Sequence, residues 1–136
     1  MGRYLDVSQN IKYAKFQISK KVPAHFSNNS SIEELWKEHE TCLKQSIDLE
    51  RQIDSGKQIT DIPSPERSFL DLKIEIANRI LRNCHFCTRR CGVNRTENKT
   101  GYCSCGCSFK VSSMFAHMVR NQSLYLQEPF SLWAAL

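Results

Sequence analysis

Six of the seven cysteines in this chain of 136 residues lie between positions 84 and 107. The first three follow the spacing C-x2-C-x3-C, at Cys84, Cys87 and Cys91. A C-x2-C pair lets two sulfurs face one ion across a tight turn, and Cys91 is close enough in sequence to supply a third. Thiolates bind zinc and iron-sulfur clusters alike. The spacing therefore predicts one metal site without fixing which metal it holds.

Three later cysteines compete to be the fourth ligand of this site. Cys103, Cys105 and Cys107 alternate along the chain, so on an extended segment all three would point to the same side. The turn-forming run Asn-Lys-Thr-Gly at 98–101 would bring the chain back to the site just before Cys103. This favours Cys103 as the fourth ligand and leaves Cys105 and Cys107 as alternatives.

Positive charge surrounds these thiols. Arg89, Arg90 and Arg95 would lower the pKa of nearby thiols and favour the thiolate that a metal needs. From residue 83 to the end the chain has six Lys and Arg against two Asp and Glu, a net +4. This excess is interpreted first as compensation for thiolate charge and second as attraction to phosphate. The second interpretation describes a stand-alone zinc module that binds nucleic acid through Arg89, Arg90, Arg95, Lys99 and Lys110.

The elements that must position the cysteines precede them. Ser31 and Glu34 have the spacing of a capping box, which predicts a helix beginning there. Apolar residues then recur at spacings of three, four and seven until Asp54-Ser55-Gly56 ends the pattern. His39 lies on the same face and is expected to pack rather than to bind a metal. The apolar positions are Ile32, Leu35, Trp36, Cys42, Leu43, Ile47 and Ile53.

A second helix is predicted directly before Cys84. Ser64 is a good N-cap and Pro65 suits the first helical position, so the helix should run from there to about Leu81 or Asn83. Its apolar residues cover more than one face, which predicts a buried helix packed on Leu35, Trp36 and Leu43.

The predicted fold class is mainly α: an antiparallel helix hairpin followed by a small cysteine-bound metal loop. The expected segments are an N-terminal arm or linker at 1–30, the hairpin at 31–83, the metal-binding segment at 84–118 and a divergent tail at 119–136. Within the arm, Ile11, Tyr13, Phe16 and Ile18 could form one short strand or dock on the rest. The N-terminus lacks an apolar signal region, and no stretch approaches ~18 uninterrupted apolar residues. We therefore expect a cytoplasmic protein without a membrane partner.

Four stretches of the sequence match one family pattern. They are Pro-Glu-Arg-Ser-Phe-Leu-Asp-Leu-Lys-Ile-Glu-Ile-Ala at 65–77, Cys-His-Phe-Cys-Thr-Arg-Arg-Cys-Gly-Val-Asn-Arg at 84–95, Gly-Tyr-Cys at 101–103, and Val-Ser-Ser at 111–113 with His117. In these stretches the chain resembles radical SAM proteins similar to pyruvate formate-lyase activating enzyme, over residues 64–118. The resemblance implies an N-terminal extension whose four cysteines, here Cys84, Cys87, Cys91 and Cys103, precede a catalytic barrel.

The part of that family that cleaves S-adenosylmethionine has no counterpart in this sequence. The family is expected to continue with a Gly-Glu-Glu-Pro segment, a glycine-rich strand and C-x3-C-x2-C, whose thiolates hold a 4Fe-4S cluster. No C-x3-C-x2-C occurs here, and Cys84, Cys87 and Cys91 have that spacing in reverse order. S-adenosylmethionine is therefore not expected to bind this chain alone, and the chain alone is not expected to be catalytic. The resemblance implies an iron-sulfur or zinc accessory segment of a separate barrel subunit, or a remnant of an interrupted gene.

Overall fold

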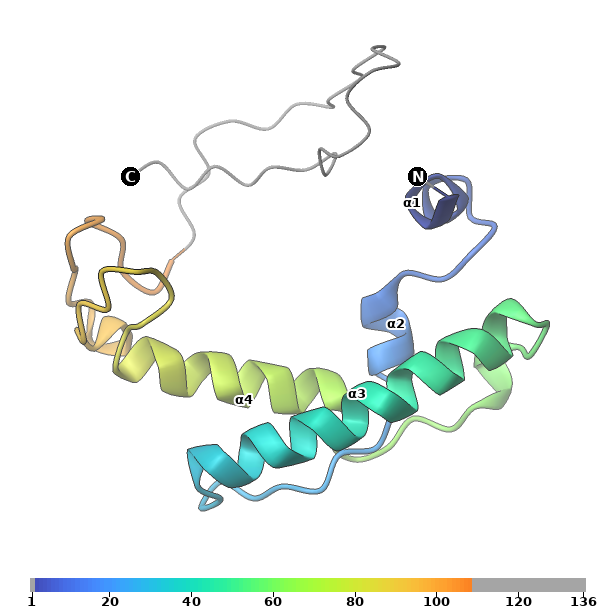
Figure 1. Ribbon diagram of the computed structural model, residues 1–136, viewed down its shortest axis with the longest axis horizontal. Helices are drawn as coiled ribbons and strands as arrows, with labels where there is room; N and C mark the ends of the chain where they lie inside the picture. The colour runs from blue at the N-terminus through green and yellow to red at the C-terminus, as the bar shows by residue number, and fades with distance from the viewer. Residues whose placement is uncertain (1, 109–136) are drawn as a thin grey trace, which may run out of the picture. The chain divides into compact units, whose positions relative to one another are not determined.

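The structure, a computed structural model, describes residues 2–108 and is mainly helical in that range, as predicted (Figure 1). No β-strand occurs among these residues. The elements are α1 (Gly2–Ser8), α2 (Lys15–Ser19), α3 (Ile32–Asp54), the 3-10 helix η1 (Ile59–Asp61), α4 (Phe69–Arg82) and the 3-10 helix η2 (Arg95–Glu97). Within the same range, no helix has both the length and the apolar character to cross a membrane.

Helix α3 begins and ends where the sequence predicted. The Ser31 hydroxyl accepts a hydrogen bond from the Glu34 amide at 3.2 Å, and the Ser31 amide donates to the Glu34 carboxylate at 2.7 Å. These two bonds satisfy donors that a helix start otherwise leaves unpaired. After Asp54 the chain reaches Gly56 with φ +114°, a conformation that favours glycine and ends the helix. Both signals are local, so the sequence alone was enough to find them.

Helix α4 begins at Phe69, so the prediction of a start at Pro65 was wrong. The Ser64 hydroxyl does not cap a helix but accepts from Lys21 Nζ at 3.0 Å. The cap is Ser68, whose hydroxyl accepts from the Asp71 amide at 3.3 Å while the Asp71 carboxylate accepts from the Ser68 amide at 2.8 Å. The end at Arg82 agrees with the prediction.

Backbone hydrogen bonds between distant segments explain why α4 begins at Phe69 and not at Pro65. The Phe69 amide donates to the Val22 carbonyl at 2.8 Å, and the Ala24 amide donates to the Arg67 carbonyl at 3.0 Å. These bonds make an isolated antiparallel bridge between Pro23 and Ser68. Ser68 is therefore paired with the N-terminal segment, and the helix begins at the next residue.

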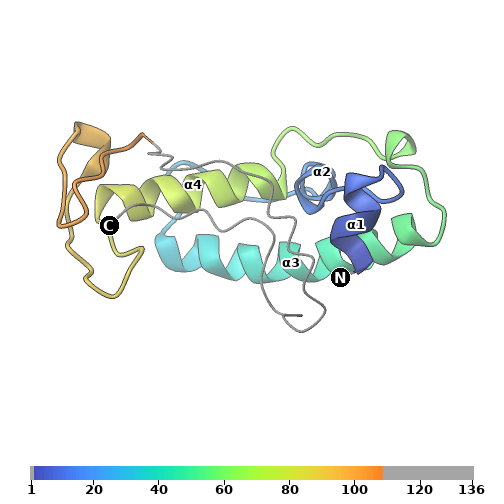
Figure 2. The same cartoon turned by 90° about the horizontal axis from the view of Figure 1, so that it is seen from above.

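The N-terminal residues contribute to the core. Helix α2 lies against the C-terminal half of α3 (Figures 1 and 2), and Ile18 packs there with Ile53 and Ile59. Ile18 is 1% exposed, whereas Ile11 and Phe16 are mostly exposed. Of the two possibilities considered for this segment, the described residues show helices and a docked Ile18 rather than a strand.

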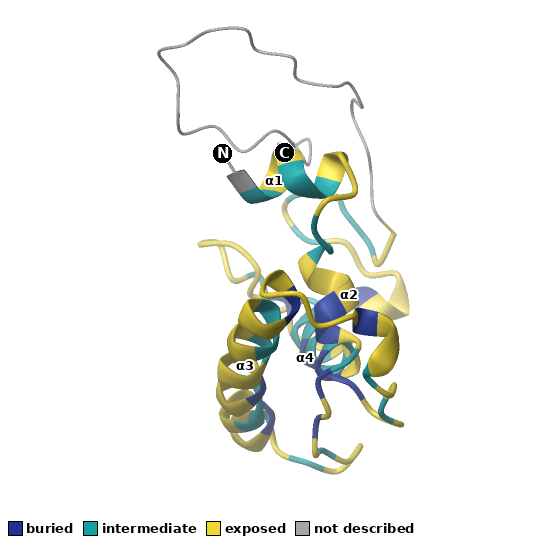
Figure 3. Cartoon of the chain, turned by 90° about the vertical axis from the view of Figure 1, so that its right-hand side faces the viewer, coloured by how far each residue is buried: buried dark blue, intermediate teal, exposed yellow. Residues whose placement is uncertain are grey.

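The apolar face of α3 is only partly covered. Leu35 and Cys42 are fully buried, as are Phe69 and Leu72 of α4. In Figure 3 the buried positions of α3 gather on its side toward α2 and α4, and the opposite side is exposed. Trp36 and Leu43, which were expected to pack against α4 together with Leu35, are 44% and 43% exposed. The apolar face predicted for α3 is therefore wider than the part of that face that other residues of the first unit bury.

His39 packs in the first unit, as its position on the helix predicted. Its ring makes edge contacts with the rings of Trp36, at 5.3 Å, and Phe69, at 5.0 Å between centroids. Burial first, and the nearby Lys73 ammonium second, lower the pKa of His39 below its usual value. The imidazole therefore serves packing between two aromatic residues.

The chain divides into two compact units, one ending at Arg79 and one beginning at Ile80. The first holds the core just described. The second holds the last residues of α4 and all six clustered cysteines. The part of the predicted metal segment beyond Ser108, with His117, and the predicted tail at 119–136 lie outside the described residues.

Candidate metal centre

Cys84 enters the second unit immediately after α4 and is fixed by its backbone. The Cys84 amide donates to the Val93 carbonyl at 3.1 Å, and the Gly92 amide donates to the Cys84 carbonyl at 2.9 Å. This pair of bonds closes the loop that contains the other two early cysteines. Gly92 has φ +66°, which glycine adopts without strain, and Cys84 is 2% exposed. Cys84 and Cys91 are therefore anchored at the two ends of one closed loop.

Cys87 lies on the exposed turn of that loop. The Arg90 amide donates to the Cys87 carbonyl at 3.1 Å, and Arg90 itself has φ +41°. The Cys87 residue is exposed, whereas Cys84 is buried and Cys91 is half-buried. This hydrogen-bonded turn lies between Cys87 and Cys91, after the C-x2-C pair, and the two thiols of that pair have different surroundings.

Arg95 is the first residue of the 3-10 helix η2, and its side chain points toward the cysteines. The Asn94 side chain caps η2 by accepting from the Thr96 amide at 3.1 Å. Asn98 ends it with φ +58°, a left-handed conformation that asparagine tolerates. A further turn, in which the Ser104 amide donates to the Gly101 carbonyl at 2.9 Å, brings Cys103 back toward Arg95. As a result, the Arg95 residue is only 5% exposed.

Three of the four predicted ligands gather around the Arg95 guanidinium. Arg95 Nη2 donates to Cys103 Sγ at 3.2 Å and to Cys91 Sγ at 3.6 Å. Arg95 Nη1 donates to the Cys105 carbonyl. The Cys84 thiol lies near enough to Arg95 for the guanidinium to lower its pKa. Two residues that are far apart in sequence, Cys91 and Cys103, therefore share one hydrogen-bond donor, with Cys84 close by.

The electrostatics of the cluster favour thiolates. Burial by itself raises the pKa of Cys84, but the Phe86 amide and the Arg95 guanidinium outweigh it and bring that pKa below its ordinary value. The Cys105 amide, and then Arg95, lower the pKa of Cys103. In return, Cys84 and Cys103 raise the pKa of Arg95. A metal competes with fewer protons at such thiols.

Gly101 lies against the sulfur of Cys91. A Cβ atom at this position would be 2.6 Å from Cys91 Sγ and 3.3 Å from Arg95 Nη2. The sequence suggested only that Gly101 lets the backbone turn. Its closeness to the thiol depends on how two distant turns meet, and nothing in the spacing of the residues indicated it.

Replacing Gly101 by alanine is expected to displace Cys91 Sγ or the Arg95 guanidinium, because the added methyl group overlaps the sulfur. The amount of metal that the chain retains against a chelator should fall. Gly106→Ala is the matched control, since a Cβ there meets no atom within 4 Å. Equal retention by both variants would mean that Cys91 does not need this approach.

The remaining thiols have other partners. The Cys105 thiol donates to the Cys103 carbonyl at 3.3 Å, and the Cys107 thiol donates to the Asn98 side chain at 3.7 Å. Cys42 is buried in the first unit, where burial first, and then Glu38, raise its pKa to about 12. Of the three candidates for the fourth ligand, only Cys103 contacts Arg95 through its sulfur among the contacts described.

Within residues 2–108, no three Cys, His, Asp or Glu side chains lie close enough together to hold a metal ion as they stand. The donor set nevertheless fits zinc or an iron-sulfur cluster, because all four predicted ligands are sulfurs and three already share a cation. Binding would require Cys87 to approach from its exposed turn. It would also require the Arg95 guanidinium to move from between the sulfurs, where the metal would sit, to a position from which it can still donate hydrogen bonds to them.

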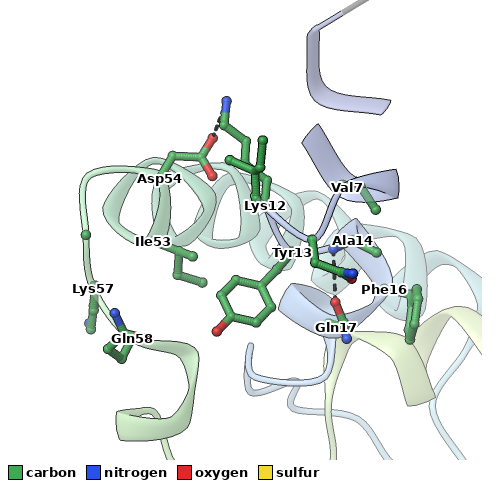
Figure 4. Close-up of a pocket in the computed structure, with 13 residues that line it drawn as sticks. Val7, Lys12, Tyr13, Ala14, Phe16, Gln17, Ile53, Asp54, Lys57 and Gln58 are labelled. Atoms are coloured by element: carbon green, nitrogen blue, oxygen red, sulfur yellow. Dashed lines mark hydrogen bonds and ion pairs between the residues drawn. The ribbon is translucent and has the colours of Figure 1, made fainter. Parts of the chain in front are cut away.

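A separate cavity of about 650 Å³ lies in the first unit (Figure 4). It is lined by the segment between α1 and α2 and by the end of α3. Lys12 and Asp54 form an ion pair at 3.6 Å at its edge, and the Ala14 amide donates to the Gln17 side chain at 3.0 Å. These polar groups thus pair with one another.

Comparisons with known proteins give one relative. Over 118 residues the chain is 37% identical to an uncharacterized protein of Methanocaldococcus jannaschii, a match that covers 87% of this chain and 32% of that protein. The chain therefore spans about a third of the length of the relative that it matches. No protein-family model matches the chain, and no solved structure matches it.

Proposed function

We propose that this chain is a cysteine-bound metal segment that holds zinc or an iron-sulfur cluster through Cys84, Cys87, Cys91 and Cys103. The observation that supports it most is the convergence of three of these residues on the buried Arg95 guanidinium. In the full proposal, α3 and α4 form an antiparallel hairpin that delivers Cys84 into a cysteine loop. The position of Cys84 two residues after α4 supports this arrangement.

We further propose that the segment belongs to a radical SAM-type protein, similar to pyruvate formate-lyase activating enzyme. The motifs at 84–95 and 101–103 support this family, and they contain every residue of the Arg95 cluster except Cys105. Cleavage of S-adenosylmethionine would belong to a barrel that this sequence does not contain, and the segment would act as its accessory. The M. jannaschii relative is about three times as long as the matched region, which leaves room for a barrel in a protein of that length.

The structure favours this function over a stand-alone zinc module that binds nucleic acid. That alternative needs free cations, but Arg95 is committed to thiols and Arg89 stacks on the Tyr102 ring at 3.4 Å. Lys99 pairs with Glu97 at 2.9 Å. Lys110 lies outside the described residues. Most of the proposed phosphate contacts therefore already have intramolecular partners.

Metal analysis of the full chain, purified without oxygen, tests the proposal. About one zinc per chain would identify a structural zinc site, and about four irons with sulfide would identify a cluster. The affinity should fall as the pH falls, because protons compete with the metal for the thiolates. A chain that retains neither metal, even after incubation with zinc or with iron and sulfide, contradicts the proposed function.

A further inference from the structure

Arg95 is a buried charged residue in a unit that is otherwise largely loop. A buried guanidinium is unfavourable unless hydrogen-bonded partners surround it. Here the partners are two sulfurs and a carbonyl, at Cys91, Cys103 and Cys105. Among the described residues of the second unit, the buried charge of Arg95 therefore bonds to the segments that carry the predicted ligands.

The shape of the guanidinium explains what it can do that a simple positive charge cannot. Its N–H groups point in fixed directions in one plane, so bonds from Nη1 and Nη2 set the relative positions of the groups that accept them. Nη2 donates to the sulfurs of Cys91 and Cys103, and Nη1 donates to the Cys105 carbonyl. A lysine ammonium could replace one of these bonds but not the planar set.

We propose that Arg95 is a positioning residue for the metal: it holds Cys91 and Cys103 in place before binding, and it donates N–H···S hydrogen bonds to their thiolates afterwards. This inference rests on the proposed function. Four thiolates around one Zn²⁺ leave a net charge of about −2, which one guanidinium partly offsets. Groups that hydrogen-bond to metal ligands orient them and tune the metal, and bonds to the sulfurs of an iron-sulfur cluster affect its reduction potential.

Neighbouring arginines provide the comparison. Arg90 is exposed and lies directly before Cys91 in the loop that precedes η2. Arg90→Gln and Arg95→Gln therefore each remove one positive charge from the second unit, but only the second removes donors to the sulfurs. Arg95→Lys keeps the charge and loses the planar set of donors.

The first measurement is zinc affinity, by competition with a coloured chelator. Arg95→Gln should bind Zn²⁺ about 10- to 100-fold more weakly than the wild type, in line with the usual effect of losing a group that supports a metal ligand. Arg90→Gln should match the wild type, and Arg95→Lys should lie between the two. Unchanged affinity of Arg95→Gln beside a wild type that binds normally overturns the inference and leaves the proposed function intact.

The second measurement separates hydrogen bonding to sulfur from a merely structural role. With each protein saturated with Co²⁺, loss of the N–H···S bonds should shift the thiolate-to-cobalt absorption to lower energy in Arg95→Gln. In iron-loaded chains the reduction potential should fall. Saturated spectra and potentials identical to those of the wild type would leave Arg95 as a structural residue only, which overturns its proposed role in the loaded site.

The third measurement needs no metal. In the metal-free chains, amide hydrogen exchange at 101–107 should be faster in Arg95→Gln than in Arg90→Gln, because Arg95 ties this segment to Cys91. Equal exchange contradicts the claim that Arg95 organises the thiols in advance. A wild-type chain that takes up no metal, but shows this difference in exchange, contradicts the proposed function and the metal-bound role together while retaining the organising one.

Discussion

Replacing Cys103 by serine is expected to remove most of the metal that the chain retains. The same loss is expected for Cys84→Ser, Cys87→Ser and Cys91→Ser, because a closed four-sulfur site loses a vertex in each case. A serine hydroxyl is a poor substitute for a thiolate at a site that favours soft ligands. Metal per chain, measured after exchange into a chelator-containing buffer, gives the result directly.

Cys107→Ser and Cys105→Ser are the controls for these four variants. The Cys107 and Cys105 thiols donate to Asn98 and to the Cys103 carbonyl, so their loss should leave the metal content near that of the wild type. Full metal in Cys103→Ser combined with loss in either control would show that the fourth ligand was assigned incorrectly. Full metal in all six variants contradicts a cysteine-bound site altogether.

Cys87→Ser is the most informative of the four. The structure gathers Cys84, Cys91 and Cys103 at Arg95 but leaves Cys87 on an exposed turn. If three thiols were enough for tight binding, this variant would keep its metal while the other three lost it. A loss equal to theirs would show that the exposed turn closes over the metal.

Local signals in the sequence predicted both ends of α3 and the end of α4, but they did not predict α1 or α2, and contacts between distant segments explain the error at the start of α4. The capping box at Ser31 involves residues three apart, so the start of α3 could be found from the sequence. The sequence analysis chose Ser64 as the cap of α4, whereas the structure has Ser68 there. The choice between them depends on the backbone bonds from 67–69 to 22–24, which no local pattern reveals.

The sequence predicted four ligands for the candidate site but not the residue that lies among them. The spacing of the cysteines predicted that Cys84, Cys87, Cys91 and Cys103 bind one metal, and this assignment stays a prediction. Arg95 was expected only as one positive charge among several. Its burial depends on the cap at Asn94 and on the left-handed turn at Asn98, and such turns show only weakly in a sequence. The same is true of Gly101, whose contact with Cys91 exists only once both turns have formed.

Phe69→Ala is expected to destabilise the first unit by about 3–5 kcal/mol, the usual cost of removing a buried aromatic ring. Phe69 is fully buried, and its ring contacts His39 at 5.0 Å between centroids and Lys73 Nζ at 4.1 Å from the centroid. Ile74→Ala on the same helix is the control. Ile74 is 51% exposed, so its truncation should change the free energy of unfolding by less than about 0.5 kcal/mol. Urea denaturation followed by circular dichroism measures both.

A loss of this size is a large part of the roughly 5–15 kcal/mol that stabilises a small domain, so Phe69→Ala could unfold at room temperature. Phe69→Leu keeps most of the buried volume and should therefore cost clearly less than the alanine variant. The order wild type, Ile74→Ala, Phe69→Leu, Phe69→Ala in decreasing urea midpoint is the expected result. If Phe69→Ala and Ile74→Ala had equal midpoints, the contacts of the Phe69 ring with His39 and Lys73 would not hold the first unit together.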